Sequence, residues 1–283
     1  MNTTYASTAA ETQYVDAPSA RFAYRRIGPR DGIPLVLLHR FRGTLDWWDP
    51  EFLDLLAADH DVILFDNVGI GYTKGEPLTT MTGNAAGAIE FVEALGLSSI
   101  DILGWSFGGV VAQEVVLLRP ELVRKLIIAG SASGVAPGMP VMGERVTNIM
   151  NKPEADLDDT LYLFYPETES ARAKGLEHFG RVRATMPADA AVVSQEAAMG
   201  QLQAIMTTLG APWEQVVENL KSITQPVLYA NGSHDVMIDA FASYAAVQVL
   251  ADAKLVLYSD AGHAFLFQHA KDFTTEVKNF LAG

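Results

Sequence analysis

The chain contains no cysteine among its 283 residues. It therefore has no disulfide framework, no thiolate nucleophile and no zinc site built on sulfur. Residues 1–10 also lack the basic start and the continuous apolar stretch of a secretory signal. We expect a cytoplasmic protein whose N-terminal residues, about ten of them, are loosely held.

Basic residues are scarce as well. Lys and Arg number 20 against 34 Asp and Glu, which leaves a formal net charge of -14. Such a charge disfavours affinity for nucleic acid and for anionic membrane surfaces. No apolar run approaches the roughly 18 residues that a membrane span requires. We therefore expect neither nucleic acid nor a membrane as a partner, and the sequence leaves the oligomeric state open.

Hydrophobic residues, in contrast, make up 49% of the chain, enough for a full core at this length. Short segments rich in Val, Ile and Leu alternate with helical patterns, and they span residues 13–16, 22–27, 35–39, 62–65, 100–103, 126–129, 227–230 and 255–258. Continuous apolar strands that alternate with helices predict a mostly parallel sheet covered on both faces. The expected architecture is a three-layer α/β fold with an antiparallel first pair of strands.

The alternation stops between the sixth and seventh of these segments. Helical patterns without a convincing strand fill the gap, at residues 155–164, 171–179 and 188–209. We predict a core domain in two parts, residues 1–133 and 213–283, with a helical cap inserted at residues 134–212.

The cap contains many methionine and aromatic side chains. Because methionine adapts to irregular apolar shapes, these residues either line a substrate pocket or pack the core of the cap itself. The candidates are Met139, Met142, Met150, Tyr162, Phe164, Phe179, Met186, Met199 and Met206.

The most specific local pattern is the hexapeptide GWSFGG at residues 104–109, between an apolar strand and a helical stretch. A turn of this kind forces its central residue into a strained backbone conformation. A Cβ atom two positions before or after that residue would collide with neighbouring backbone, which requires Gly104 and Gly108. The pattern predicts Ser106 as a nucleophile.

A serine hydroxyl needs an imidazole to accept its proton and a carboxylate to orient that imidazole. The segment NGSHD follows strand 227–230 and ends at Asp235, and the segment DAGH follows strand 255–258 and ends at His263. Asp239 and Asp260 are rival carboxylates. Position directly after a strand end favours Asp235, since functional residues concentrate on such loops.

In its glycine pattern around the serine and in the order Ser106, Asp235, His263, the chain resembles the α/β-hydrolase superfamily. It is most similar to the capped esterase, lactonase and cofactor-free haloperoxidase branch. The resemblance extends over nearly the whole chain outside the cap. It implies an eight-stranded, mostly parallel sheet with helices on both faces, a catalytic triad of these three residues, and no cofactor.

The resemblance also implies an oxyanion hole made of two backbone N–H groups. One belongs to Phe107, and the other, matched by position in the loop HRFRG at residues 39–43, belongs to Phe41. Two donors of this kind commonly stabilise the transition state by about 2.7 to 4 kcal/mol each. His39 is expected to hold the loop by hydrogen bonds.

The oxyanion loop departs from the family at Arg40, where a glycine is usual. Arg40 and Arg42 either bind a substrate carboxylate near the reacting carbonyl, or anchor the loop on acidic neighbours, or point into solvent. Trp105, next to the nucleophile, either shapes the acyl pocket or packs beneath it. These alternatives stay open at the level of the sequence.

Asp66 begins a segment, DNVGIGYT, that resembles the family's Asp-x-x-Gly-x-Gly turn and is expected to be structural. A dinucleotide loop would require a third glycine where Lys74 stands, so nucleotide binding is set aside. The histidine spacing does not match the helical pairs of common metal sites, and no metal is expected.

These patterns predict a cofactor-independent serine hydrolase acting on a small or medium, largely apolar ester or lactone. Serine at the nucleophile position argues against haloalkane dehalogenases and epoxide hydrolases, which use a carboxylate. Perhydrolase (cofactor-free haloperoxidase) and C–C bond hydrolase activities use the same triad and stay open. A ligand receptor with little turnover is the alternative from another class, because fold does not fix function.

Overall fold

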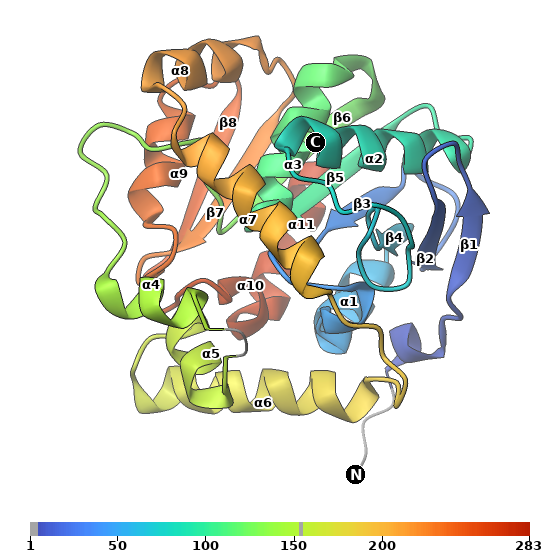
Figure 1. The fold of residues 1–283 in the computed structure, drawn as a ribbon, viewed down its shortest axis with the longest axis horizontal. Coiled ribbons are helices and arrows are strands. Elements are labelled where there is room, and N and C mark those ends of the chain that lie inside the picture. Colours follow the sequence, from blue (N-terminus) through green and yellow to red (C-terminus); the bar gives the residue numbers. More distant parts are fainter. Residues whose placement is uncertain (1–4, 153–154) are drawn as a thin grey trace.

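The computed structural model describes residues 5–152 and 155–283 (Figure 1). An eight-stranded sheet of order β1-β2-β4-β3-β5-β6-β7-β8 forms its centre. The strands are β1 Gln13–Asp16, β2 Arg21–Ile27, β3 Leu35–Leu38, β4 Val62–Phe65, β5 Ile100–Trp105, β6 Val123–Ala129, β7 Val227–Gly232 and β8 Ala253–Tyr258.

β2 pairs antiparallel with both β1 and β4, and the remaining neighbours are parallel. The predicted mostly parallel sheet with an antiparallel start is therefore confirmed. Because β3, β5, β6, β7 and β8 run in one direction, their carboxyl ends meet at one edge of the sheet. Loops leaving that edge are the usual place for functional residues in such folds.

Helices cover both faces of the sheet. The α-helices are α1 Pro50–Ala57, α2 Met81–Ala94, α3 Phe107–Leu118, α4 Glu144–Met150, α5 Leu157–Phe164, α6 Glu169–Thr185, α7 Gln195–Leu209, α8 Trp213–Ser222, α9 Ala240–Val247, α10 Phe265–Gln268 and α11 Ala270–Ala282. Short 3-10 helices are η1 Ala6–Ala9, η2 Leu45–Trp47 and η3 Pro120–Leu122.

Successive side chains of a strand point to opposite faces, and β3 illustrates how this builds three layers. Leu35 and Leu37 pack in one apolar core with residues of α1 and α11. Val36 and Leu38 pack in a second core with residues of α2, α3 and α8. All four residues of β3 are buried, which explains its continuous apolar sequence.

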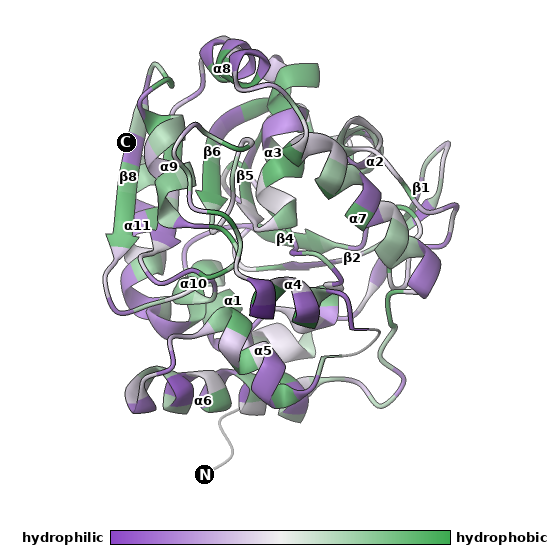
Figure 2. Ribbon diagram, turned by 60° about the vertical axis from the view of Figure 1, so that its left-hand side comes forward, coloured by the Kyte–Doolittle hydropathy of each residue, from purple (hydrophilic) through white to green (hydrophobic). Residues whose placement is uncertain are grey.

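Figure 2 shows how hydrophilic and hydrophobic residues are distributed along the helices and strands. β6 is hydrophilic near its start, at Arg124 and Lys125, and hydrophobic toward its end, whereas α6 mixes the two kinds of residue. No helix in the described ranges is long and apolar enough to cross a membrane.

From residue 5 onward, the start of the chain differs from the sequence-based expectation of about ten loose residues, of which residues 1–4 lie outside the described part of the chain. Residues 6–9 form η1, and the backbone N–H groups of Ala6 and Ser7 donate to the Asp54 carboxylate at 2.8 and 2.7 Å. This carboxylate on α1 comes from a distant part of the sequence, so no local pattern predicts the contact.

The segment between β6 and β7 is helical, as its pattern indicates. The predicted helices at 155–164 and 171–179 correspond to α5 and α6, and the predicted helix 188–209 begins later, at Gln195. Ser194 sets that start because its side chain accepts a hydrogen bond from the Ala197 N–H at 3.1 Å. The division of the chain at residues 134 and 212 stays a prediction.

Helices α4, α5 and α6 lie together at one end of the molecule, and α7 crosses in front of the sheet (Figure 1). A partly buried ion pair connects α6 to the start of α1, with Arg181 Nη2 2.5 Å from Asp49 Oδ2. Asp49 also accepts from the Glu51 N–H at 2.9 Å and so caps α1. This ion pair links the helical segment to the start of α1.

Candidate active site

Ser106 occupies the sharp turn between β5 and α3. Its φ of 57° and ψ of -120° lie outside the regions that non-glycine residues favour. Its N–H donates to the Ala129 carbonyl at 2.9 Å, and the Ser131 hydroxyl donates to its carbonyl at 2.7 Å. These two bonds to the neighbouring strand β6 and the segment after it hold the strained turn in place.

Gly104 and Gly108 make this turn possible. A Cβ atom on Gly104 would lie 2.3 Å from the Gly108 carbonyl oxygen, and one on Gly108 would lie 2.2 Å from the Leu38 carbonyl oxygen. Both contacts are with backbone, which has little freedom to move in the middle of a sheet. The geometry accounts for the two glycines flanking Ser106.

Gly108→Ala is expected to lower the free energy of unfolding by about 2 to 4 kcal/mol, because β3 and α3 must separate to admit the methyl group. Urea unfolding followed by circular dichroism measures the change. Gly180→Ala is the matched control, since Gly180 lies in α6 with no atom within 4 Å of the added Cβ. It is expected to raise stability by about 0.5 to 1 kcal/mol. Equal effects of the two substitutions would contradict the steric argument.

Asp235 and His263 come together at the ends of β7 and β8. His263 Nδ1 lies 2.7 Å from Asp235 Oδ2, and both residues are buried. The N–H groups of Met237 and Ile238 each donate to Asp235 Oδ1 at 2.9 Å. These bonds orient the carboxylate toward the imidazole.

The two rival carboxylates have other partners. Asp239 accepts from the Phe241 N–H at 2.8 Å and caps α9. Asp260 Oδ1 lies 2.9 Å from His269 Nε2 in an exposed pair. Of the three candidates, the structure therefore brings only Asp235 to His263.

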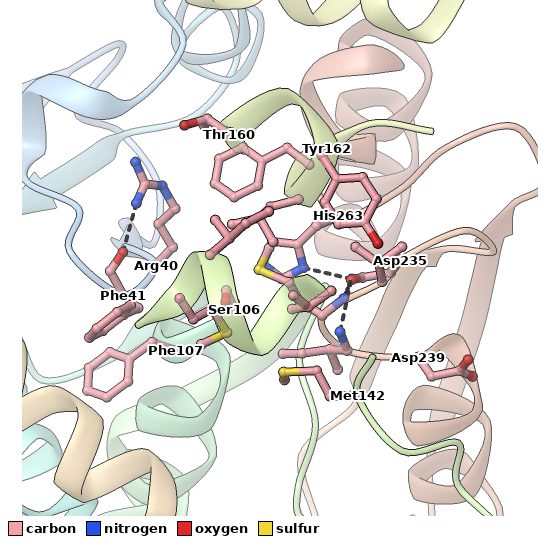
Figure 3. A pocket seen from close by; sticks show the side chains of 18 of the residues that line it. Arg40, Phe41, Ser106, Phe107, Met142, Thr160, Tyr162, Asp235, Asp239 and His263 are labelled. Atoms are coloured by element: carbon pink, nitrogen blue, oxygen red, sulfur yellow. Dashed lines mark hydrogen bonds and ion pairs between the residues drawn. The ribbon is translucent and has the colours of Figure 1, made fainter. Parts of the chain in front are cut away.

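Ser106 and His263 line the same cavity (Figure 3). Because Asp235 engages Nδ1, the other ring nitrogen of His263, Nε2, is the one available to the serine. No hydrogen bond joins Ser106 Oγ to this ring within the described part of the chain. Catalytic hydrogen bonds of this kind often tighten only when substrate binds.

Trp105 lies beneath the site instead of on the cavity wall. It is buried, its Nε1–H donates to the His263 carbonyl at 3.0 Å, and its ring packs 5.7 Å from the His263 ring. Of the two alternatives for Trp105, the structure therefore rejects a side chain that shapes the acyl pocket and supports one that packs beneath it. The physical reason is the alternation of side chains along β5, which turns Trp105 away from the face that Ser106 presents.

The oxyanion loop and the start of α3 each place one backbone donor at the cavity. Neither the Phe41 N–H nor the Phe107 N–H has a hydrogen-bond partner among the described residues. Phe107 is the first residue of α3, where a helix leaves its N–H groups unpaired and carries a partial positive charge. Two such amides suit a developing oxyanion.

His39 holds the loop, as the sequence predicts. Its Nδ1 accepts a hydrogen bond from the Arg40 N–H at 2.7 Å. Burial, together with the nearby positive charge of Arg40, lowers the pKa of His39 well below its usual value, so the ring is neutral. Arg40 fits where the family has glycine because the left-handed residue of this loop is Arg42, with a φ of 56°.

The cavity has a volume of about 1080 Å³ and a mainly apolar wall. Of the expected cap side chains, those on the wall are Met139, Met142, Met150, Tyr162, Phe164 and Phe179, whereas Met186, Met199 and Met206 are not. Arg40 and Arg42 also line it.

The sequence analysis did not predict α4, and it therefore missed two cavity residues on that helix, Val146 and Ile149. Their spacing of three residues, which is typical of one face of a helix, was the available signal. It also missed Arg183, an exposed arginine at the rim.

A family model described as alpha/beta hydrolase fold matches residues 33–270. The chain belongs to this family. Among solved structures, an alpha/beta hydrolase fold protein from Chitinophaga pinensis is 32% identical and superposes with a TM-score of 0.86 over 97% of this chain and 98% of that one.

Curated relatives of this alpha/beta hydrolase have different activities. A provisionally named non-heme bromoperoxidase of Mycobacterium tuberculosis is 29% identical over 89% of this chain and 94% of its own length. A 2-hydroxymuconate semialdehyde hydrolase of Pseudomonas putida is 28% identical over 78% of this chain and 76% of its own. The family assignment therefore leaves the substrate undecided.

Asp66 connects the turn after β4 of this alpha/beta hydrolase to η2, which follows the oxyanion loop. Its Oδ1 accepts from the Leu45 N–H at 2.8 Å, and its Oδ2 accepts from the Tyr72 N–H at 2.9 Å. Burial raises the pKa of Asp66 to about 7, although these two donors oppose the shift. The contacts agree with a structural role.

The contribution of Asp66 to stability is expected to fall as the pH rises from about 4 to 7, because folded Asp66 then holds a proton that the unfolded chain, with a pKa near 3.9, releases. The raised pKa corresponds to a loss of about 2 to 4 kcal/mol across this range. Asp66→Asn should remove this part of the pH dependence, and Asp16→Asn, an exposed site with the same charge change, should keep it. Urea unfolding at several pH values measures this dependence. If the free energy of unfolding changed with pH equally in the parent and in Asp66→Asn, the raised pKa of Asp66 would be refuted.

Proposed function

We propose that this protein is a serine hydrolase that cleaves a small or medium, largely apolar carboxylic ester or lactone through an acyl-enzyme intermediate. The observation that carries the proposal is the buried Asp235–His263 pair, 2.7 Å apart, at the same cavity as Ser106 on its strained turn. The three residues follow three parallel strands of one sheet, and this agrees with the order of the family's triad.

In the proposed acylation step, Ser106 Oγ attacks the substrate carbonyl while His263 Nε2 accepts the hydroxyl proton. Asp235 stabilises the imidazolium ion that forms, and the N–H groups of Phe41 and Phe107 bind the oxyanion. His263 then donates its proton to the leaving alkoxide. A water molecule, activated by the same imidazole, attacks the acyl-enzyme and releases the acid.

The mainly apolar wall of the cavity supports an apolar substrate body. Side chains from α4, α5 and α6, such as Ile149, Leu163 and Phe179, line the same cavity as the catalytic residues. This arrangement supports a role for residues 134–212 as a cap that selects the substrate by shape.

The relatives favour two variants of this chemistry as second candidates. With hydrogen peroxide in place of water, the acyl-enzyme would yield a peracid, the chemistry of a perhydrolase, and the bromoperoxidase name of one relative supports testing it. With a ring-cleavage product as substrate, a C–C bond would break, and the name of the semialdehyde hydrolase supports that test.

A fluorophosphonate probe tests the nucleophile directly. We expect it to label Ser106, identified by peptide mass spectrometry, and heat-denatured protein to remain unlabelled. A panel of para-nitrophenyl esters, lactones, acetate with peroxide, and a ring-cleavage product then ranks the activities. A folded protein that is never labelled and turns over nothing, yet is stabilised by an apolar ligand, would instead support the receptor alternative.

A further inference from the structure

Arg40 stands apart from most half-buried arginines of this protein. Five others each lie within 4 Å of a carboxylate, and they are Arg25 with Asp46, Arg26 with Asp61, Arg119 with Glu93, Arg172 with Asp158, and Arg181 with Asp49. Within residues 5–152 and 155–283, Arg40 and its neighbour Arg42 have no such partner. The two arginines therefore do not anchor the loop on acidic neighbours in the described part of the chain. Because both are half-buried, their side chains also do not simply point into solvent.

The surroundings of Arg40 hold its guanidinium without neutralising it. Its Cζ lies 5.2 Å from the ring centre of Phe164, 5.5 Å from that of Trp47 and 5.8 Å from that of Trp105. Nη1 donates to the Phe41 carbonyl at 2.8 Å. Burial and the charge of Arg42 lower the pKa of Arg40 to about 10, so it stays charged at neutral pH.

A charge held in this way is unfavourable unless something compensates for it. A partly desolvated cation without a counter-ion costs stability, and the second cation, Arg42, adds repulsion. The Nε of Arg42 is itself buried without a partner in the described structure. An anion at this wall of the cavity would relieve both costs.

The position of Arg40 relates it to the reacting atoms. It precedes Phe41, whose N–H is the second oxyanion donor, and it lines the same cavity as Ser106 and His263. In Figure 3 the Arg40 side chain lies on the opposite side of Ser106 from Asp235. A substrate group bound at Arg40 would therefore share the cavity with the nucleophile.

We propose that Arg40 binds a carboxylate of the substrate, so that the natural substrate is an acidic ester, lactone or related acyl compound with an apolar body. Arg42 contributes positive potential from the next turn of the loop. A guanidinium suits this task because its fixed fork of donors matches the two oxygens of a carboxylate. The inference rests on the proposed hydrolase function and narrows its substrate class.

Matched ester pairs test the inference. The para-nitrophenyl hemiesters of succinate, glutarate and adipate are compared with the butyrate, pentanoate and hexanoate esters of equal acyl length. We expect wild type to prefer at least one hemiester over its neutral partner. Arg40→Met should lower kcat/KM for that hemiester about 10- to 100-fold more than for its neutral partner, mainly through KM.

Two further variants serve as controls. Arg172→Met removes the same charge from the outer face of α6, away from the cavity, and should leave the ratio of hemiester to neutral ester unchanged. Arg40→Lys keeps the charge and should restore part of the preference. Equal losses on both esters in Arg40→Met, or no preference in wild type, would overturn the proposal.

Melting temperature separates a binding role from a loop anchor. Arg40→Met removes a charge that has no counter-ion among the described residues, so the melting temperature should stay unchanged or rise by about 2 to 4 °C. Loss of a loop anchor would instead lower the melting temperature. Glutarate should stabilise Ser106→Ala and not the Ser106→Ala, Arg40→Met double variant. This binding assay works even if no ester is hydrolysed, so failure of the hydrolase function and failure of the Arg40 site give different results.

Discussion

Ser106→Ala is expected to lower kcat for an activated ester by about 10⁴- to 10⁶-fold and to abolish labelling by the fluorophosphonate probe. The hydroxyl is the only group of the protein that forms a bond with the acyl carbon in the proposed mechanism. Residual hydrolysis would come from the oxyanion donors and from substrate binding. Stopped-flow detection of the para-nitrophenol burst, with peptide mass spectrometry of the probe adduct, measures the loss.

The fold should not change with this substitution, because no hydrogen bond of Ser106 Oγ contributes to it in the described residues. The melting temperature is expected to stay within about 2 °C of wild type. Ser170→Ala, an exposed serine on α6, serves as the control and should keep full activity and labelling. A Ser106→Ala protein that still shows a burst would rule out the serine mechanism.

Asp235→Asn is expected to lower kcat by about 10⁴-fold at neutral pH. The amide can still accept the hydrogen bonds from Met237 and Ile238 through its oxygen, but its NH2 group then faces His263 Nδ1. This leaves the proton of a neutral imidazole on Nε2, where the ring cannot act as a base toward Ser106. It also removes the charge that stabilises the imidazolium ion.

Asp260→Asn is the matched control for this prediction. Asp260 pairs with His269 at the surface, and its loss should change kcat by less than about 2-fold. Initial rates for both variants, measured over pH 5 to 9 after confirming the fold by circular dichroism, decide between the carboxylates. Activity that depends on Asp260 and tolerates Asp235→Asn would reverse the assignment.

The strands of the core and the serine turn were predictable from sequence because their causes are local. Apolar strands buried on both faces leave continuous runs such as that of β3, and the strained turn leaves its two glycines. Helix limits were less predictable, as α7 illustrates. The pattern favours a helix from residue 188, while capping by Ser194 moves the start to Gln195.

Trp105 and Arg40 illustrate what a linear pattern cannot resolve. Sequence left open whether Trp105 lines the pocket or packs below it, and the direction of its side chain from β5 decides for packing. For Arg40 the open question was whether an acidic neighbour exists. The answer depends on every segment that folds around the loop, including Phe164 from α5.

By itself, the sequence determined the layered α/β fold and the candidates Ser106, Asp235 and His263, because periodicity, turn glycines and strand-end position act over a few residues. Only the tertiary structure decided which carboxylate meets His263 and whether Arg40 has a counter-ion. These are contacts between distant segments, and their energies depend on distance and burial, which no local pattern encodes. The same reason makes the charge of Arg40, which has no counter-ion among the described residues, the most specific guide to the substrate.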